Sequence, residues 1–177
     1  MKKTILRYGF IAGLVAPIIM LLSLLFGVDH LDSIWGMVIG YAGMIIAFSF
    51  IFVAIVKYRD QINNGVISFG RALLIGLAIS LIASTMYVAA WMIEYKYVFP
   101  DFMDKYAAKE LVKMKNDGAS ETEIQKASTE MAEFKEMYKN PGVRIAFTYA
   151  EILPIGIFAS LLAAAILRRK KYVAFDA

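Results

Sequence analysis

One carboxylate in the sequence stands apart from the other charged residues. Glu151 lies in the apolar run AFTYAEILPIG, residues 146–156, and no lysine or arginine occurs within six residues on either side of it. An ionised carboxylate in a membrane-like setting is costly unless it is paired or hydrated, and such residues are candidates for function. The sequence therefore indicates either a satisfied charge or a site for a ligand, an ion or a proton.

Four residues are candidate partners of Glu151. Arg144 precedes it by seven residues, which places both on nearly the same face of a helix. Lys96, Tyr87 and His30 belong to segments that we expect to end on the same side of the membrane. We favour a structural carboxylate satisfied by one of these partners over a functional site, and both interpretations stay open.

The remaining chemistry-bearing residues give weaker indications. His30, the single histidine, lies between Asp29 and Asp32, and the three could bind a metal ion. We favour a polar turn, because such groups often meet by chance in a short exposed loop. The sequence has no cysteine and no H-E-x-x-H, G-x-S-x-G or Walker motif. We therefore predict a protein that is not an enzyme, with no catalytic residues, no metal and no cofactor.

The composition indicates a membrane protein. Hydrophobic residues make up 60% of the 177 residues, whereas soluble domains are about half apolar. Four stretches reach the ~20 residues that cross a bilayer, at about 5–28, 34–56, 69–93 and 145–167. These stretches lack a polar face, which argues against a large soluble core. We predict an all-α integral membrane four-helix bundle that forms a single domain over residues 1–177.

The distribution of charge predicts the orientation of this bundle. One side holds ten of the 19 cations and only two of the 15 acids, whereas the other holds nine cations and thirteen acids. Lysine and arginine are enriched in cytoplasmic segments, so both termini and the 57–71 loop are expected in the cytoplasm. The basic excess is an orientation signal, with some attraction to anionic lipid, and does not indicate binding to nucleic acid.

The long segment between the third and fourth spans has helical features of its own. Met103, Tyr106, Ala107, Leu111 and Met114 share one face, the sequence NDGAS then breaks the pattern, and Ser120 with Glu123 forms a capping box. A second apolar stripe follows through 124–138, and the sequence KNPG is expected to end it. We predict an extracytoplasmic helical hairpin at about 100–140. We also expect Ser68 to cap the third span.

Small residues spaced four apart predict how the spans pack. Lipid does not drive helices together, so close approach at small side chains does. The candidate packing residues are Gly9, Gly13, Gly36, Gly40, Ala72, Gly76, Ser80, Ser84, Gly156, Ser160 and Ala164. We favour packing within one chain over dimerisation, although a homo-oligomer stays open.

Several segments together resemble a known bacterial family. They are LRYGFIAGL, IGYAGMIIAFSFIF, KYRDQ followed by GVISFGRAL, YVAAWMIEYKYVFPDFMDKYA, MAEFKEMYKNP, and EILPIG followed by SLLAAAILRRK. This pattern is similar to the membrane family named domain of unknown function 4199. The resemblance implies a four-span protein of the bacterial inner membrane, and it assigns no activity, substrate, cofactor or functional residue.

These observations lead to two hypotheses about function. The first is a non-enzymatic membrane protein that acts through protein or lipid contacts of its outer hairpin, residues 101–138. The alternative is a small transporter or channel component that uses Glu151 in an outer vestibule. An enzyme ranks third, because no catalytic constellation is present.

Overall fold

The described part of the chain consists of helices. The computed structural model describes residues 1–25 and 34–169, without the side chains of residues 16, 20–25 and 34–37. The helices are α1 (Lys2–Leu25), α2 (Ile34–Gln61), α3 (Phe69–Tyr97), α4 (Phe102–Asn116), α5 (Glu121–Tyr138) and α6 (Pro141–Leu167). Within these ranges there is no β-strand, and one isolated bridge pairs Ile67 with Arg169. The predicted all-α class is confirmed.

Three of the described helices are long and apolar enough to cross a membrane. They are the Val38–Gln61 part of α2, together with α3 and α6. The remaining predicted span, 5–28, corresponds to α1, and its spanning role stays a prediction. Helices α2 and α3 continue several residues beyond the apolar runs from which the spans were predicted. An apolar run marks the part of a helix that is expected to lie in lipid. The helix itself can continue into water, because its backbone hydrogen bonds do not require apolar side chains.

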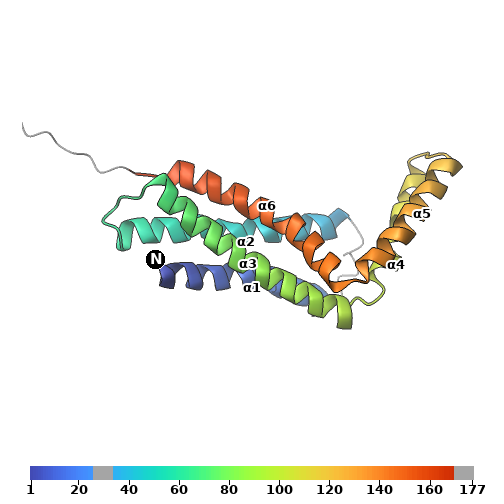
Figure 1. The fold of residues 1–177 in the computed structure, drawn as a ribbon, viewed down its shortest axis with the longest axis horizontal. Helices are drawn as coiled ribbons and strands as arrows, with labels where there is room; N and C mark the ends of the chain where they lie inside the picture. The colour runs from blue at the N-terminus through green and yellow to red at the C-terminus, as the bar shows by residue number, and fades with distance from the viewer. Residues whose placement is uncertain (26–33, 170–177) are drawn as a thin grey trace, which may run out of the picture.

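The long helices α1, α2, α3 and α6 pack side by side and are here called the long-helix bundle (Figure 1). Helix α3 contacts the other three, and α6 is its most extensive partner. The α4–α5 pair stands off obliquely at one end of this bundle (Figure 1). The bundle therefore holds the apolar mass of the chain, and the pair projects from it.

Basic residues gather at the other end of the bundle. The ring centroid of Tyr8 in α1 lies 6.0 Å from Lys57 Nζ at the end of α2. The Arg169 N–H donates to the Ile67 carbonyl at 2.9 Å, which joins the end of α6 to the start of α3. These contacts bring together what we call the basic end, made up of Lys2, Lys3, Arg7, Lys57, Arg59, Arg71, Arg168 and Arg169.

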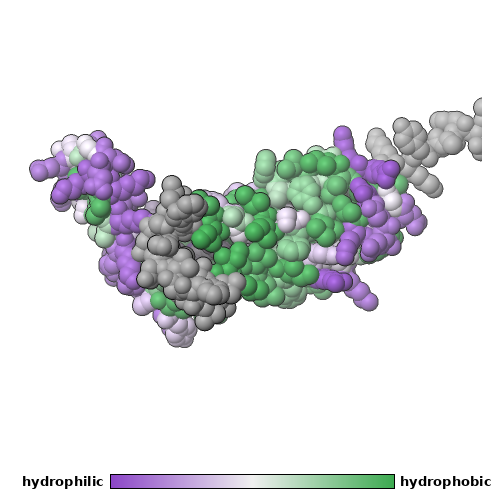
Figure 2. Space-filling view, turned by 180° about the vertical axis from the view of Figure 1, so that it is seen from behind, coloured by the Kyte–Doolittle hydropathy of each residue, from purple (hydrophilic) through white to green (hydrophobic). Residues whose placement is uncertain are grey.

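An apolar surface covers the bundle between its two ends. Figure 2 shows hydrophobic residues over the middle of the long helices, with hydrophilic residues at the basic end and on the α4–α5 pair. Large apolar side chains point outward there: Phe158 is 67% exposed and Ile45 is 68% exposed. A water-soluble protein rarely leaves so large an apolar area uncovered. The surface has the distribution expected of helices surrounded by lipid.

Small residues form the contact between α3 and α6. A Cβ added to Gly76 would lie 2.8 Å from Ser160 Cβ, so the two backbones are as close as these residue types permit. The Ser80 hydroxyl donates to the Gly156 carbonyl at 2.9 Å and lies 3.0 Å from the Ser160 hydroxyl. Ala72, Ser84 and Ala164 are also buried. This ladder is used for packing within the chain.

The other candidate packing glycines behave differently from one another. Gly9 and Gly13 of α1 face α3, because a Cβ at these positions would meet Ile82 and Met86 at 2.9 Å and 2.5 Å. A Cβ at Gly40 would meet no described atom within 4 Å, so the described part of the chain gives it no close helix contact. Gly36 belongs to the residues whose side-chain surroundings are not described. The four-residue spacing in the sequence did not distinguish glycines that contact another helix from glycines that do not.

The close approach at Gly76 can be tested by adding a single methyl group. Gly76→Ala places a Cβ against Ser160, and overpacking of this kind costs about 1–3 kcal/mol. Gly70→Ala, in the same helix, meets nothing within 4 Å and should be neutral or slightly stabilising. Thermal melting in detergent should show a lower Tm only for Gly76→Ala. Equal melting of the two variants would contradict the packing.

Candidate functional site

The first turns of α6 carry a buried arginine. Asn140 caps this helix by accepting a hydrogen bond from the Gly142 N–H at 2.8 Å, and Pro141 occupies its first position. The sequence KNPG therefore opens α6 as well as closing α5, which was not predicted. Arg144 follows in the first turns of α6 and is only 7% exposed.

Arg144 is held by aromatic rings and a backbone carbonyl. Its guanidinium carbon lies 4.1 Å from the ring centroid of Tyr95 and 5.9 Å from that of Tyr138. Nη1 donates to the Tyr138 carbonyl at 3.1 Å, and Nε contacts the sulfur of Met92 at 3.3 Å. A guanidinium over an aromatic face gains up to about 2 kcal/mol when desolvated. Arg144 thus joins α6 to α3 and α5.

Aromatic residues extend this contact to four helices, α3, α4, α5 and α6. Trp91 Nε1 donates to the Tyr138 hydroxyl at 3.0 Å, and the Trp91 ring meets that of Phe102 with centroids 4.9 Å apart. Burial raises the pKa of the Tyr138 hydroxyl, so this group stays neutral as it accepts the hydrogen bond. The aromatic–arginine cluster consists of Trp91, Tyr95, Phe99, Phe102, Phe134, Tyr138, Arg144 and Phe147.

Glu151 lies seven residues beyond Arg144, about 10 Å further along α6. Its side chain is exposed at the side of the helix, and the described residues offer it no hydrogen bond or ion pair. The hydroxyl of Tyr87 is within electrostatic range of Glu151. Arg144 contacts Tyr95 and Tyr138 instead. The described contacts include no ion pair between Glu151 and Arg144, so their pairing stays a prediction.

The other predicted partners of Glu151 lie apart from it or outside the description. Lys96 is exposed, and its Nζ lies 5.0 Å from the ring centroid of the neighbouring Tyr97. His30, with Asp29 and Asp32, falls outside the described residues. The described ranges contain no group of three or more acids or histidines close enough to hold a metal ion. Of the four predicted partners, Tyr87 is the one within electrostatic range of Glu151 among the described residues.

Glu94 is a buried carboxylate that sequence reasoning missed. It is 8% exposed in the last turn of α3, and the described residues give its carboxylate no hydrogen bond or ion pair. Tyr87 is within electrostatic range of Glu94 as well as Glu151. The apolar run that predicted the third span ends at 93, so Glu94 was assigned to the outer loop. The helix continues to Tyr97 and carries Glu94 into packed surroundings.

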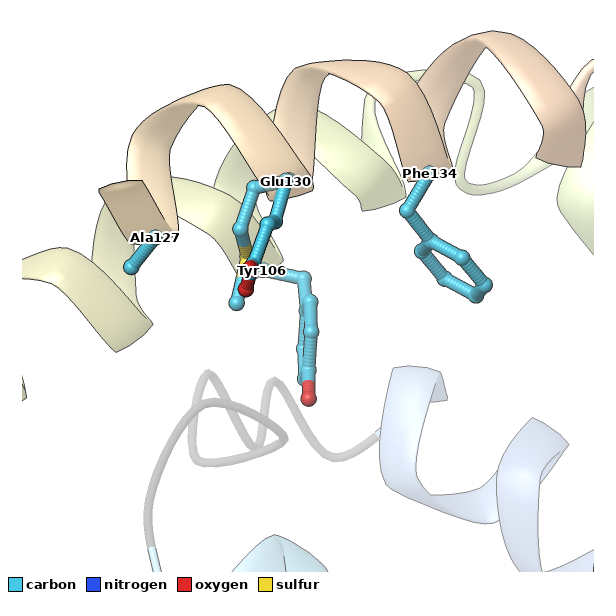
Figure 3. Close-up of a pocket in the computed structure, with 5 residues that line it drawn as sticks. Tyr106, Ala127, Glu130 and Phe134 are labelled. Atoms are coloured by element: carbon cyan, nitrogen blue, oxygen red, sulfur yellow. The ribbon is translucent and has the colours of Figure 1, made fainter. Parts of the chain in front are cut away.

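The α4–α5 pair has its own packing and an open apolar groove. An ion pair between Lys135 and Asp104 joins the two helices. The predicted capping box is present at the start of α5, where Ser120 and Glu123 exchange hydrogen bonds. Tyr106, Ala127, Glu130, Met131 and Phe134 line a hollow of about 250 Å³ on this pair (Figure 3). Tyr106 and Phe134 point to the same side of it (Figure 3).

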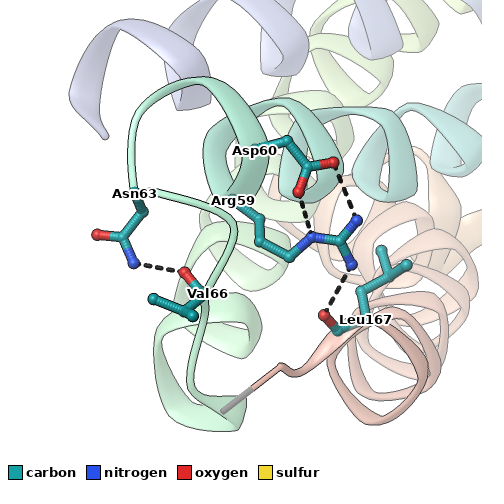
Figure 4. A network of polar contacts seen from close by, with 5 residues as sticks. All are labelled: Arg59, Asp60, Asn63, Val66 and Leu167. Atoms are coloured by element: carbon teal, nitrogen blue, oxygen red, sulfur yellow. Dashed lines mark hydrogen bonds and ion pairs between the residues drawn. The ribbon is translucent and has the colours of Figure 1, made fainter. Parts of the chain in front are cut away.

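Polar contacts close the basic end. Arg59 forms a bidentate pair with Asp60, at 2.6 Å and 3.0 Å, and its Nη1 donates to the Leu167 carbonyl at 3.2 Å (Figure 4). The donated bond satisfies a carbonyl at the end of α6. Asn63 Nδ2 donates to the Val66 carbonyl, which shapes the turn before α3. At the start of α3, the predicted Ser68 cap accepts from the Arg71 N–H.

The long helices and their apolar surface define a helical protein of the membrane type. The chain belongs to the family described as "Protein of unknown function (DUF4199)", whose model matches residues 7–169. This confirms the family that the sequence resembles. No curated protein and no solved structure matches the chain.

Replacing Arg144 by lysine tests whether a planar guanidinium is needed. Lysine keeps the charge but loses the flat stacking surface and the two directed N–H groups. We expect Arg144→Lys to lower stability by about 1–3 kcal/mol and to reduce amide protection in residues 102–138. Arg168→Lys, an exposed arginine at the other end, is the matched control. If both variants melt alike, the cluster does not depend on the guanidinium.

Proposed function

We propose that this chain is a four-span protein of the bacterial inner membrane that acts without catalysis, through contacts made by its α4–α5 hairpin outside the cytoplasm. One observation carries the proposal. The aromatic–arginine cluster fixes the base of the hairpin to the long helices, while α4 and α5 themselves stand clear of the bundle (Figure 1). Among the described residues, the hairpin is held at its base and extends away from the bundle along its length (Figure 1), which suits it to contact a partner.

The packing of α1 supports a fourth span. This helix has 24 residues, which gives a length of about 36 Å against a hydrocarbon thickness of about 30 Å. It lies against α2 and α3, with Gly9 and Gly13 turned toward α3. Glycines at such a contact let two backbones approach within lipid. The sequence of α1 beyond Arg7 contains no charged residue.

The basic end supports the proposed orientation. Its arginines and lysines come from the start of α1, from the end of α2, from the start of α3 and from the residues after α6. The contacts of Tyr8, Arg59 and Arg169 draw them together. Cytoplasmic loops carry the excess of such residues. The hairpin then lies on the opposite side. Its stretch 101–139 holds nine acids and seven lysines, so its net charge is negative and no positive excess opposes its export.

A second candidate is a small transporter or channel component, supported by the two carboxylates near Tyr87. The described residues pair neither Glu94 nor Glu151 with a cation or a hydrogen-bond donor. Carboxylates in such positions often mark a path for ions or protons. This candidate requires the Glu151 carboxylate to take part in transport.

Substitutions at Glu151 separate these possibilities. If no group is paired with the Glu151 carboxylate, Glu151→Leu leaves no group without its partner. This variant should then melt at or above the temperature of the wild-type protein in detergent. If a partner holds the carboxylate, Glu151→Leu should lose about 1–3 kcal/mol and Glu151→Gln should lose less. A transport role makes a different prediction: Glu151→Gln should keep the melting temperature and abolish ion or proton flux in proteoliposomes. Unchanged flux would remove the second candidate.

The absence of cysteine allows the proposed function to be tested by labelling. A membrane-impermeant maleimide added to intact bacterial cells should label Ser120→Cys and spare Gln61→Cys. Along α5, Ala127→Cys in the groove should react more slowly than Ala132→Cys on the exposed face, because contact covers the groove. Labelling of Gln61→Cys from outside would overturn the orientation. Equal rates at 127 and 132 would overturn the contact function.

A further inference from the structure

We infer that the apolar face of the hairpin, defined by Tyr106, Ala127, Met131 and Phe134, lies on the outer surface of the lipid bilayer beside α6. This rests on the proposed location of the hairpin outside the cytoplasm, and it names the bilayer as the partner that the hairpin meets.

The hairpin face is continuous with the lipid-facing surface of α6. Phe134, which lines the groove, meets Phe147 of α6 edge to face with ring centroids 5.1 Å apart. Phe147 is 48% exposed and belongs to a helix that is apolar enough to span a membrane. The same lipid that covers the outer part of α6 therefore borders Phe134. An apolar surface that begins in the membrane continues onto the hairpin without a polar break at this contact.

Helix α4, the first helix of the hairpin, continues the same surface. The ring of Tyr106 stacks on that of Phe102 with centroids 6.2 Å apart, and Phe102 packs on Trp91 of α3. Aromatic residues with one polar atom are typical of the membrane–water boundary. Tyr106 is about half exposed, so its ring is available to the interface while its hydroxyl can reach water.

Short connections keep the hairpin near the membrane. Only residues 98–101 separate α3 from α4, and only residues 139–140 separate α5 from α6. The hairpin leaves the bundle obliquely (Figure 1), so one of its faces is turned back toward the side of the bundle. Tyr106 and Phe134 project from the pair to one side (Figure 3). An inclined hairpin anchored at the boundary can rest this face on the bilayer without any change in the bundle.

The size and chemistry of the face favour lipid over a protein partner. The groove is lined by five residues, whereas a stable protein interface uses about 20–30 residues on each side. Amphipathic helices at a bilayer bury their apolar side about 5–10 Å into the headgroup boundary. Glu130 at the groove can keep its carboxylate among the headgroups. Ala132 and Glu133, on the exposed side of α5, then face water.

Spin labels can identify what covers this face. The full-length protein would be reconstituted into liposomes of phosphatidylethanolamine and phosphatidylglycerol with a nitroxide at Ala127→Cys or, as the matched control, at Ala132→Cys. Oxygen concentrates in lipid, and a water-soluble nickel complex is excluded from it. We expect the label at 127 to collide with nickel several-fold less often, and with oxygen more often, than the label at 132. Adding Met131→Glu should return the label at 127 to water, whereas Glu133→Gln should not.

Each outcome has a definite meaning. Lipid exposure at 127 in liposomes that contain no other protein supports the inference. A label at 127 that is protected from both oxygen and nickel is covered by protein, either this chain or a second copy, and overturns it. A label at 127 that is as open to nickel as the label at 132 also overturns it. In that last case, slow maleimide labelling at 127 in cells would still support the proposed contact function, with a protein as the partner.

Discussion

The contact between α3 and α6 sets the position of the candidate site residues that these two helices carry. Lipid provides no hydrophobic force between helices, so two spans associate where their backbones can approach closely. Gly76 against Ser160, and Ser80 against Gly156, supply that approach in the middle of the bundle. The hydroxyls of both serines are directed to the Gly156 carbonyl. Hydrogen bonds of this kind fix the register of the two helices as well as their separation.

This register determines what lies at the end of the bundle. Twelve residues along α3 from Ser80 is Met92, and twelve residues back along α6 from Gly156 is Arg144. These two side chains are in contact at 3.3 Å. The same antiparallel register therefore runs from the glycine–serine contact to the arginine. A shift of either helix by one residue would turn Arg144 away from Tyr95 and separate the hairpin from its anchor.

The cluster places charges where helix dipoles disfavour them. Arg144 lies near the positive N-terminus of α6, and Glu94 lies near the negative C-terminus of α3, each at a cost of about 0.3–1 kcal/mol if it is charged. For Arg144 the faces of two tyrosines and a carbonyl offset this cost. Glu94 has no such compensation among the described residues. This asymmetry is consistent with Arg144 acting as an anchor, whereas Glu94 is a buried acid without an ion pair or a side-chain hydrogen bond among the described residues.

The sequence predicted the features that depend on a local pattern of residues. It did not predict the burial of residues near helix ends, because the apolar runs do not mark where the helices end. Three of the four apolar runs, the capping box at Ser120 and Glu123, and the Ser68 cap follow from neighbouring residues, and the structure confirms them. Arg144 and Glu94 were assigned to the outer loop because the apolar runs end before them. Arg144 is buried against Tyr95 of α3 and Tyr138 of α5, which no local pattern relates to it. Gly40 shows the converse, since a regular spacing does not guarantee a neighbour.

The two ends of this register use different packing chemistry. In the middle of the bundle, beneath the apolar surface, small residues and serines make the contact. From Trp91 onward the contact is made by large aromatic rings, whose burial is most favourable where water is the alternative. Helices of 15 and 18 residues are barely stable alone in water. The α4–α5 pair therefore needs the aromatic–arginine cluster below it, and the chain changes from one packing chemistry to the other at the level where its acidic, exposed segment begins.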